Sequence, residues 1–312
     1  FFIIEYFMIV RPRQHWLRML FVLRGSVLPR ILPQLATVTF FALLVTFLHG
    51  QLFHLKVPLT FVPFTLIGVA LAVFLGFRNN ASYDRYWEGR KLWGMILSES
   101  RTLARQFLTL PQKVDVTQQR HFVLTLVAIA YSLRHQLRDT DASHDLQRLL
   151  PPNLALCLQS ARFAPNLLIL HLASLLQQQR QQQSLDSMLA AQMEQPLAKI
   201  TDGISGCERL SNTPLPYTYV VILHRTAYLY CFLLPFALVN AIGWTTPIMV
   251  AFIAYTFFAL EALSDELEDP FGTSANDLPL ESMCVMIETT LCEMLGDKDL
   301  PVALKPVNYV LL

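Results

Sequence analysis

Charged side chains are scarce in this chain of 312 residues. Asp, Glu, Lys and Arg together make up 15% of it, whereas an ordinary globular domain has about 25%. Hydrophobic residues make up 54%, and the mean hydropathy is +0.41. The net charge of +1 gives no indication of nucleic acid or of an acidic substrate as a partner. This composition predicts a membrane protein that also has a substantial soluble part.

Sequence motifs of enzymes are missing as well. The chain contains no His-Glu-x-x-His, no phosphate-binding loop, no Gly-x-Ser-x-Gly and no Cys-x-x-Cys. The eight histidines are scattered, and each is more simply explained as a structural or surface residue than as a metal ligand. We therefore expect no enzymatic activity and no required cofactor.

Cysteines are few, odd in number and without metal-ligand spacing. Disulfides are not expected, because most of the cysteines fall in segments that we place in the cytoplasm. We expect buried structural thiols at Cys157, Cys207, Cys231, Cys284 and Cys292.

A cleavable signal peptide is not expected either. The early apolar residues are interrupted by Arg11 and Arg13, and no small-residue cleavage site follows them. Met8 is the expected natural start, and we leave residues 1–7 out of the fold argument.

Long stretches without charge are present, and four of them are expected to span a membrane. An α-helix needs about 20 apolar residues to cross the hydrocarbon core. The longest charge-free stretch, from Thr226 to Leu260, is too long for one helix and divides naturally at residues 240–243. The expected spans are Ile31–Leu48, Val57–Phe77, Tyr217–Val239 and Trp244–Leu260.

Basic residues orient these spans. Arginines and lysines gather before the first span and after the second, and basic residues are enriched on the cytoplasmic side of membrane proteins. Both termini are therefore expected in the cytoplasm. We divide the chain into an N-terminal segment, the first two spans, a cytoplasmic domain, the last two spans and a C-terminal segment, at 1–30, 31–77, 78–216, 217–264 and 265–312.

The cytoplasmic domain is expected to be helical. Apolar residues recur at helical spacing over Gln119–Thr140, and the composition of Pro165–Ile200 is that of a helix. The second span is expected to continue to Leu110 as one long helix, with Pro111 as its stop signal. No strand is expected in 78–216, and the sequence predicts an all-α membrane protein with four transmembrane helices.

The second span carries two stripes at helical spacing. Gly68, Ala72 and Gly76 form a small-residue stripe that lets another helix approach closely. A row of larger apolar residues follows one position later, at Val69, Val73 and Phe77. Such a row could line a narrow pore. It could also face lipid or pack against other helices, which is the more common role in membrane helices.

An acidic segment follows the fourth span. Hard cations such as calcium favour clustered carboxylate oxygens, so one interpretation is a cation site. The alternative, which we favour on chemistry alone, is a network of ion pairs near the membrane. The acids are Glu261, Asp265, Glu266, Glu268 and Asp269, and the candidate basic partners are Arg11, Arg13, Arg78 and Arg209.

Several short motifs occur together, in order, around the four expected spans. They are Arg11-Pro12, Gly76-Phe77-Arg78-Asn79, Leu92-Trp93-Gly94, Pro214-Leu215-Pro216-Tyr217-Thr218 and Glu268-Asp269-Pro270-Phe271-Gly272. With these motifs the chain resembles the bestrophin family of ion channels, in its bacterial branch. The resemblance covers nearly the whole chain, from Met8 to about Leu295.

The resemblance implies a homopentamer of four-span subunits around one central pore, in the inner membrane of a bacterium. It places the narrow apolar neck of the pore on Val69, Val73 and Phe77, the row already found by spacing. It places a second, cytoplasmic constriction near Met188, where packing in a helix core is the alternative.

The calcium site of animal bestrophins maps onto Glu266, Asp269 and Asp277. This chain departs from the animal pattern, because Thr273-Ser274-Ala275-Asn276 stands where animal members carry consecutive acids. A divalent cation, calcium or zinc, is therefore a weak expectation, and calcium gating is not expected.

The permeant ion is expected to be small and monovalent. The bacterial resemblance favours cations such as sodium, and the alternative is a chloride or other anion channel of the animal type. A secondary transporter would be expected to show internal repeats and an ionisable group at mid-membrane, which we do not find. A membrane scaffold would need a docking constellation in 78–216, and none is evident.

Overall fold

The computed structural model describes residues 15–19, 22–23, 25–48, 51–52, 55–56, 61–274 and 276–306. These residues form two compact units. We call residues 15–86 and Pro214–Asp269 the apolar unit, and Trp87–Thr213 with residues 270–306 the polar unit.

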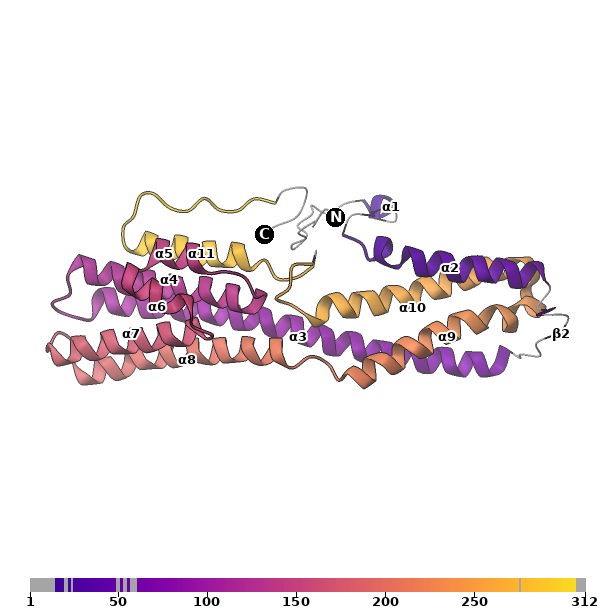
Figure 1. The fold of residues 1–312 in the computed structure, drawn as a ribbon, viewed down its shortest axis with the longest axis horizontal. Helices are drawn as coiled ribbons and strands as arrows, with labels where there is room; N and C mark the ends of the chain where they lie inside the picture. Colours follow the sequence, from indigo (N-terminus) through magenta and orange to yellow (C-terminus); the bar gives the residue numbers. More distant parts are fainter. Residues whose placement is uncertain are drawn as a thin grey trace. The chain divides into compact units, whose positions relative to one another are not determined.

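The described elements are mostly helices (Figure 1). In chain order they are α1 (Trp16–Met19), α2 (Leu28–Phe47), β1 (Gln51–Leu52), β2 (Leu55–Lys56), α3 (Phe61–Thr109), α4 (Val116–Arg138), α5 (Ser143–Leu149), α6 (Pro152–Gln159), α7 (Ala164–Gln181), α8 (Ser187–Asn212), α9 (Tyr217–Ile242), the short 3-10 helix η1 (Gly243–Thr245), α10 (Thr246–Glu268) and α11 (Leu280–Met294).

The apolar unit packs α2, α9, α10 and the first part of α3 around one core. α10 lies against both α2 and α9 (Figure 1). Small residues at the centre of this core, such as Ala42, Ala227 and Ala254, are fully buried. They let the helix backbones approach closely, which is how helices associate in lipid.

α9 and α10 form a hairpin. Gly243 has φ +55° and begins the 3-10 turn between the two helices. The ring of Tyr228 in α9 stacks on that of Phe258 in α10 at 4.5 Å between centroids, so the two helices lie side by side.

Three helical stretches of the described chain are long and apolar enough to cross a membrane: Leu28–Phe47, Phe61–Thr109 and Tyr217–Glu268. The last of these contains α9, η1 and α10. The described part of each span expected from the sequence falls within one of these stretches, except for Leu48, the residue after α2; residues 57–60 lie outside the described chain.

The long helix expected after the second span is confirmed. α3 runs without interruption from Phe61 to Thr109, two residues before Pro111. Gly89 does not break it. The position of a Cβ there would lie 3.1 Å from the ring of Phe271, so the glycine makes room for a close neighbour.

The polar unit packs α4 against α5, α7 and α11, and α7 against α8 (Figure 1). The Asp115 side chain accepts a hydrogen bond from the backbone N–H of Thr117 at 2.7 Å and so caps α4. The rings of Phe107 and Phe122 stack with their centroids 3.7 Å apart and join α3 to α4. The helix expected over Gln119–Thr140 is thus confirmed, with bounds of Val116–Arg138.

A buried polar network ties α11 to α4 and α5. Glu288 is 4% exposed, accepts a hydrogen bond from Tyr131 Oη at 2.7 Å and pairs with Arg148. Burial and this carboxylate raise the pKa of Tyr131, so the phenol keeps its proton and acts as a donor. Burial likewise raises the pKa of the nearby Cys284 thiol to about 12, which makes it unreactive.

Two expectations for this part of the chain were wrong. Pro165–Ile200 is not one helix, because Gln183 has φ +55° and Asp186 caps a new helix by accepting a hydrogen bond from the N–H of Met188. Residues 78–216, all of which the structure describes, contain no strand, as expected; the two-residue antiparallel pair of β1 and β2 lies before α3, in the apolar unit. All five cysteines are described and free, as expected, but Cys157 is exposed rather than buried.

Candidate pore-lining surface

One face of α3 is packed into the core of the apolar unit. Phe64, Leu71, Leu75, Arg78 and Ser82 follow one another at helical spacing, and none is more than 7% exposed. At about 100° per residue these positions lie within roughly 30° of one direction around the helix axis. This direction defines the inward side of α3.

The row Val69, Val73 and Phe77 lies on the opposite side of the helix. Its positions are centred about 170° around the axis from the buried face. The three side chains are 60%, 49% and 60% exposed. α3 therefore turns this apolar row away from its own subunit, as a pore-lining row requires. The neck itself needs several copies of the chain and stays a prediction.

The small-residue stripe has two environments. A Cβ at Gly68 would lie 2.7 Å from Tyr230 Oη, so this glycine permits the close packing of α3 on α9. Gly76 has no atom within 4 Å of its Cβ position. The expectation of close helix approach is thus confirmed at Gly68 and finds no support at Gly76 within the described residues.

A buried arginine lies one residue after the neck row. Arg78 is 1% exposed, and its Nη2 lies 2.6 Å from Asp265 Oδ1 and 3.6 Å from Glu268 Oε2. Arg30 reaches the other oxygen of Asp265 at 3.2 Å. Burying a charge is costly unless it is paired, so these carboxylates hold the arginine in place.

Further polar contacts join α3 to α10 near the ion pairs of Arg78. Asn79 Nδ2 donates to the carbonyl of Leu260 at 3.1 Å, and the hydroxyls of Ser82 and Ser264 lie 2.9 Å apart. Arg85 Nε donates to the carbonyl of Glu268 at 2.9 Å. These bonds fix the rotation of α3 and, with it, the outward direction of the neck row.

The ion-pair interpretation of the acidic segment is confirmed for Asp265 and Glu268, which pair with Arg78. It was wrong for Arg209, which pairs with Glu88 at 2.5 Å within the polar unit. Arg11 and Arg13 lie outside the described residues.

The sequence did not reveal two basic partners of these acids. One is Arg30, although it is one of the arginines that precede the first span. The other is His224, whose Nδ1 lies 2.6 Å from Glu261 Oε1. No sequence signal pairs residues so far apart in the chain.

The candidate cation site is only partly described by the structure. Asp277 is 3% exposed, and its Oδ2 accepts a hydrogen bond from the N–H of Ser274 at 2.6 Å. Glu266 is half-buried and Asp269 is exposed, and both belong to the apolar unit whereas Asp277 belongs to the polar unit. No group of three His, Cys, Asp or Glu side chains suited to a metal occurs among the residues that the structure describes. The cation site stays a prediction.

Met188 lies at the start of α8 and is 78% exposed. The alternative that it packs in a helix core was therefore wrong. Its proposed role at a cytoplasmic constriction stays a prediction.

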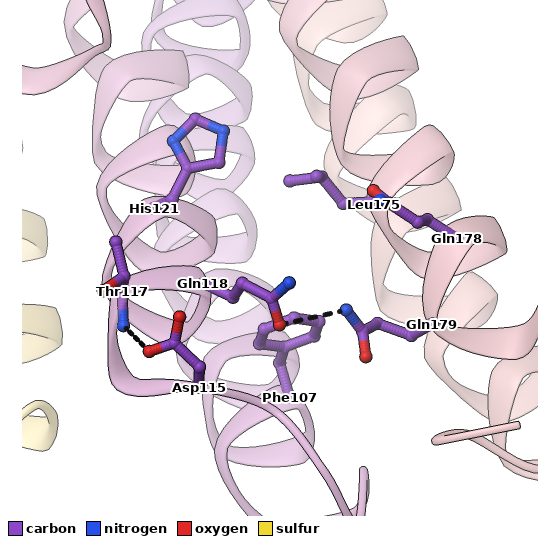
Figure 2. Close-up of a pocket in the computed structure, with 8 residues that line it drawn as sticks. All are labelled: Phe107, Asp115, Thr117, Gln118, His121, Leu175, Gln178 and Gln179. Atoms are coloured by element: carbon purple, nitrogen blue, oxygen red, sulfur yellow. Dashed lines mark hydrogen bonds between the residues drawn. The ribbon is translucent and has the colours of Figure 1, made fainter. Parts of the chain in front are cut away.

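The polar unit also contains a cavity of about 210 Å³ between α4 and α7, shown in Figure 2. Its lining consists of Phe107, Asp115, Thr117, Gln118, His121, Leu175, Gln178 and Gln179. Gln179 donates to the side-chain oxygen of Gln118 at 3.4 Å across it. Asp115, its one carboxylate, already caps α4, so this lining carries no paired acid and base.

A histidine pair lies beside this cavity. The Nε2 atoms of His121 and His171 are 2.9 Å apart, and partial burial lowers the pKa of both rings. The close approach requires at least one neutral ring, because an N–H of one must point at a lone pair of the other.

Comparison with known proteins identifies relatives along nearly the whole chain. The family model described as Bacterial/Fungal Bestrophin protein matches residues 8–293. A voltage-dependent anion channel-forming protein of Ralstonia nicotianae is 46% identical over 294 residues, which is 94% of this chain and 96% of the relative. A protein of the same description from Escherichia coli is 41% identical over 303 residues, covering 97% and 99%.

A solved structure agrees with these matches. The crystal structure of a bacterial bestrophin homologue from Klebsiella pneumoniae superposes with a TM-score of 0.82 at 41% identity. The match covers 86% of this chain and 100% of that one.

Proposed function

Because the chain belongs to the bacterial and fungal bestrophin family, a family of ion channels rather than enzymes, we propose that it forms a pentameric channel for small monovalent ions. Each subunit crosses the bacterial inner membrane four times and keeps both termini in the cytoplasm. The pore narrows at an apolar neck formed by α3.

The four passes are supported by the hairpin of α9 and α10. The stretch Tyr217–Glu268 is too long for a single crossing, since about 20 residues suffice for one. η1 reverses the chain in its middle, and the two helices pack side by side. With α2 and the first part of α3, this gives four crossings.

The observation that carries the proposal is the outward row on α3. Val69, Val73 and Phe77 are exposed on the side opposite to the packed face, while the polar contacts with α10 fix the rotation of the helix. Five copies of such a row would make an uncharged constriction that sheds water and hinders ions, so it can act as a gate.

Two classes of ion are candidates. The names of the Ralstonia and Escherichia relatives favour an anion such as chloride, against the cation that we expected from the sequence. A cation such as sodium has support from an exposed carboxylate, Asp84, on the same face of α3. A neck of valine and phenylalanine does not itself select the sign of charge.

Conduction is proposed to be independent of calcium. Asp277 is already held in a turn with Ser274, and the run of acids found in animal members is missing. Removing calcium from both faces should leave the current unchanged, and a clear loss would contradict this part of the proposal.

The test is a planar-bilayer recording of the purified protein under a sodium chloride gradient. A reversal potential near the chloride equilibrium value identifies an anion channel, and one near the sodium value identifies a cation channel. The purified protein should have a mass of five times 35.6 kDa, or about 178 kDa, without bound detergent. A monomer or dimer that passes no current would contradict the channel and favour a transporter or a scaffold.

A further inference from the structure

The exposed row on α3 does not stop at the neck. Asn80 and Asp84 follow Phe77 by three and seven residues and are both exposed. At about 100° per residue they lie within roughly 30° of the centre of the neck row. With a rise of about 1.5 Å per residue, Asp84 lies about 10 Å beyond Phe77 along the helix axis.

Asp84 has no basic partner in the part of the chain that the structure describes. Among the residues that the structure describes, no ion pair or hydrogen bond of its side chain is found. Two arginines near it in sequence bind other groups: Arg78 binds Asp265, and Arg85 Nε donates to the carbonyl of Glu268. Arg90, six residues after Asp84, lies about 120° away around the helix axis. The next basic residue on the row, Lys91, follows only after about two more helical turns. The carboxylate of Asp84 therefore lies on the same side of α3 as the neck row.

We infer that Asp84 sets the charge preference of the channel. This inference rests on the proposed pentamer, in which five Asp84 side chains form a ring of carboxylates at the cytoplasmic mouth of the neck. Such a ring raises the local concentration of cations and lowers that of anions. The uncharged neck then conducts the ions that are concentrated at its cytoplasmic end.

Salt limits the size of the effect. If the five charges lie about one Debye length from the axis, some 8 Å at physiological ionic strength, each sign of ion is favoured or disfavoured about fivefold, so the cation-to-anion ratio changes by at most roughly 25-fold. The change should shrink as salt rises, because the Debye length falls to about 3 Å at 1 M.

The test compares Asp84→Asn with the wild-type channel in reversal-potential recordings. The ratio of cation to anion permeability should fall by about fivefold or more, whichever ion the wild type prefers. Asp84→Glu keeps the charge and should retain the wild-type ratio. Asn80→Asp adds a second ring one turn closer to the neck and should raise the ratio. Asp299→Asn removes an exposed carboxylate of the polar unit as a matched control and should leave the ratio unchanged.

A second measurement does not depend on the asparagine variant. In an Asp84→Cys, Cys157→Ser protein, the introduced thiol can be modified selectively, because the exposed Cys157 is removed and burial protects Cys207 and Cys284. A sulfonate-bearing thiol reagent should restore the cation preference, and an ammonium-bearing one should lower it further.

The outcomes separate the inference from the channel proposal. If the Asp84→Asn protein forms a conducting pentamer whose permeability ratio equals that of the wild type at low and at high salt, Asp84 does not set the charge preference, and the channel proposal stands. The same holds if the two thiol reagents act alike. A wild-type protein that neither forms a pentamer nor conducts overturns both.

Discussion

Removing the carboxylate of Asp265 should destabilise the protein far more than removing its outer partner, Arg30. Asp265 bridges two arginines of unequal burial: the Arg78 side chain is 1% exposed and that of Arg30 is 53% exposed. Asp265→Ala breaks both ion pairs, whereas Arg30→Ala breaks only the outer one. The difference between the two variants isolates the effect of stranding a buried arginine.

The magnitudes follow from burial. Depriving a buried charge of its partner costs about 3–5 kcal/mol. Glu268 stays 3.6 Å from Arg78, and the Asp265 side chain is 37% exposed, so we reduce the expected cost to about 2 kcal/mol. The exposed pair with Arg30 should contribute less than about 1 kcal/mol. Its removal also takes a positive charge from the N-terminal turn of α2, where such a charge is unfavourable.

Thermal unfolding in detergent measures this difference, with the loss of the folded size-exclusion peak as the readout. At about 2–4 °C per kcal/mol, Asp265→Ala should lower the midpoint by roughly 4–8 °C and Arg30→Ala by less than about 4 °C. Asp265→Asn, which keeps the shape and one acceptor, should fall between them. Equal shifts for Asp265→Ala and Arg30→Ala would refute the argument that the pairing of the buried Arg78 contributes most of the stability that Asp265 provides.

Three further predictions concern the neck, helix packing and pH. Val73→Ala should raise ion flux through a wetter neck, and unchanged flux in bilayer recordings would contradict its place there. Gly206→Ala should destabilise the protein by about 1–3 kcal/mol and so lower the thermal midpoint, because its Cβ would lie 2.6 Å from a leucine side chain. Gly76→Ala, with nothing within 4 Å, should not lower it, and equal loss in both variants would refute this account. The lowered pKa values of His121 and His171 mean that the unfolded chain binds protons more readily. Stability should therefore fall as the pH drops below about 6.5, and less steeply in a variant with Gln at both positions.

The sequence allowed the membrane helices to be located closely. Charge-free runs of about 20 residues have few structural alternatives, because a lipid environment requires every backbone polar group to be bonded internally. The length of α3 could be predicted for a similar reason, since no strong helix breaker occurs before Pro111. The break within Pro165–Ile200 could not, because it depends on a left-handed Gln183 and on capping by Asp186, and both residues also occur inside helices.

The candidate pore-lining row could likewise be predicted only in part. Helical spacing alone placed Val69, Val73 and Phe77 on one face, because the period of a helix is fixed by its backbone hydrogen bonds. Whether that face looks inward or outward depends on what packs against the opposite side.

The sequence by itself determined that this is a helical membrane protein and which residues share a face of the second span. Only the tertiary structure decided that this face points away from the subunit and that Arg78 is buried against Asp265. The physical reason is the range of the interactions involved. Helix formation and hydrophobic length are set by neighbours along the chain, whereas burial and ion pairing join residues nearly two hundred positions apart.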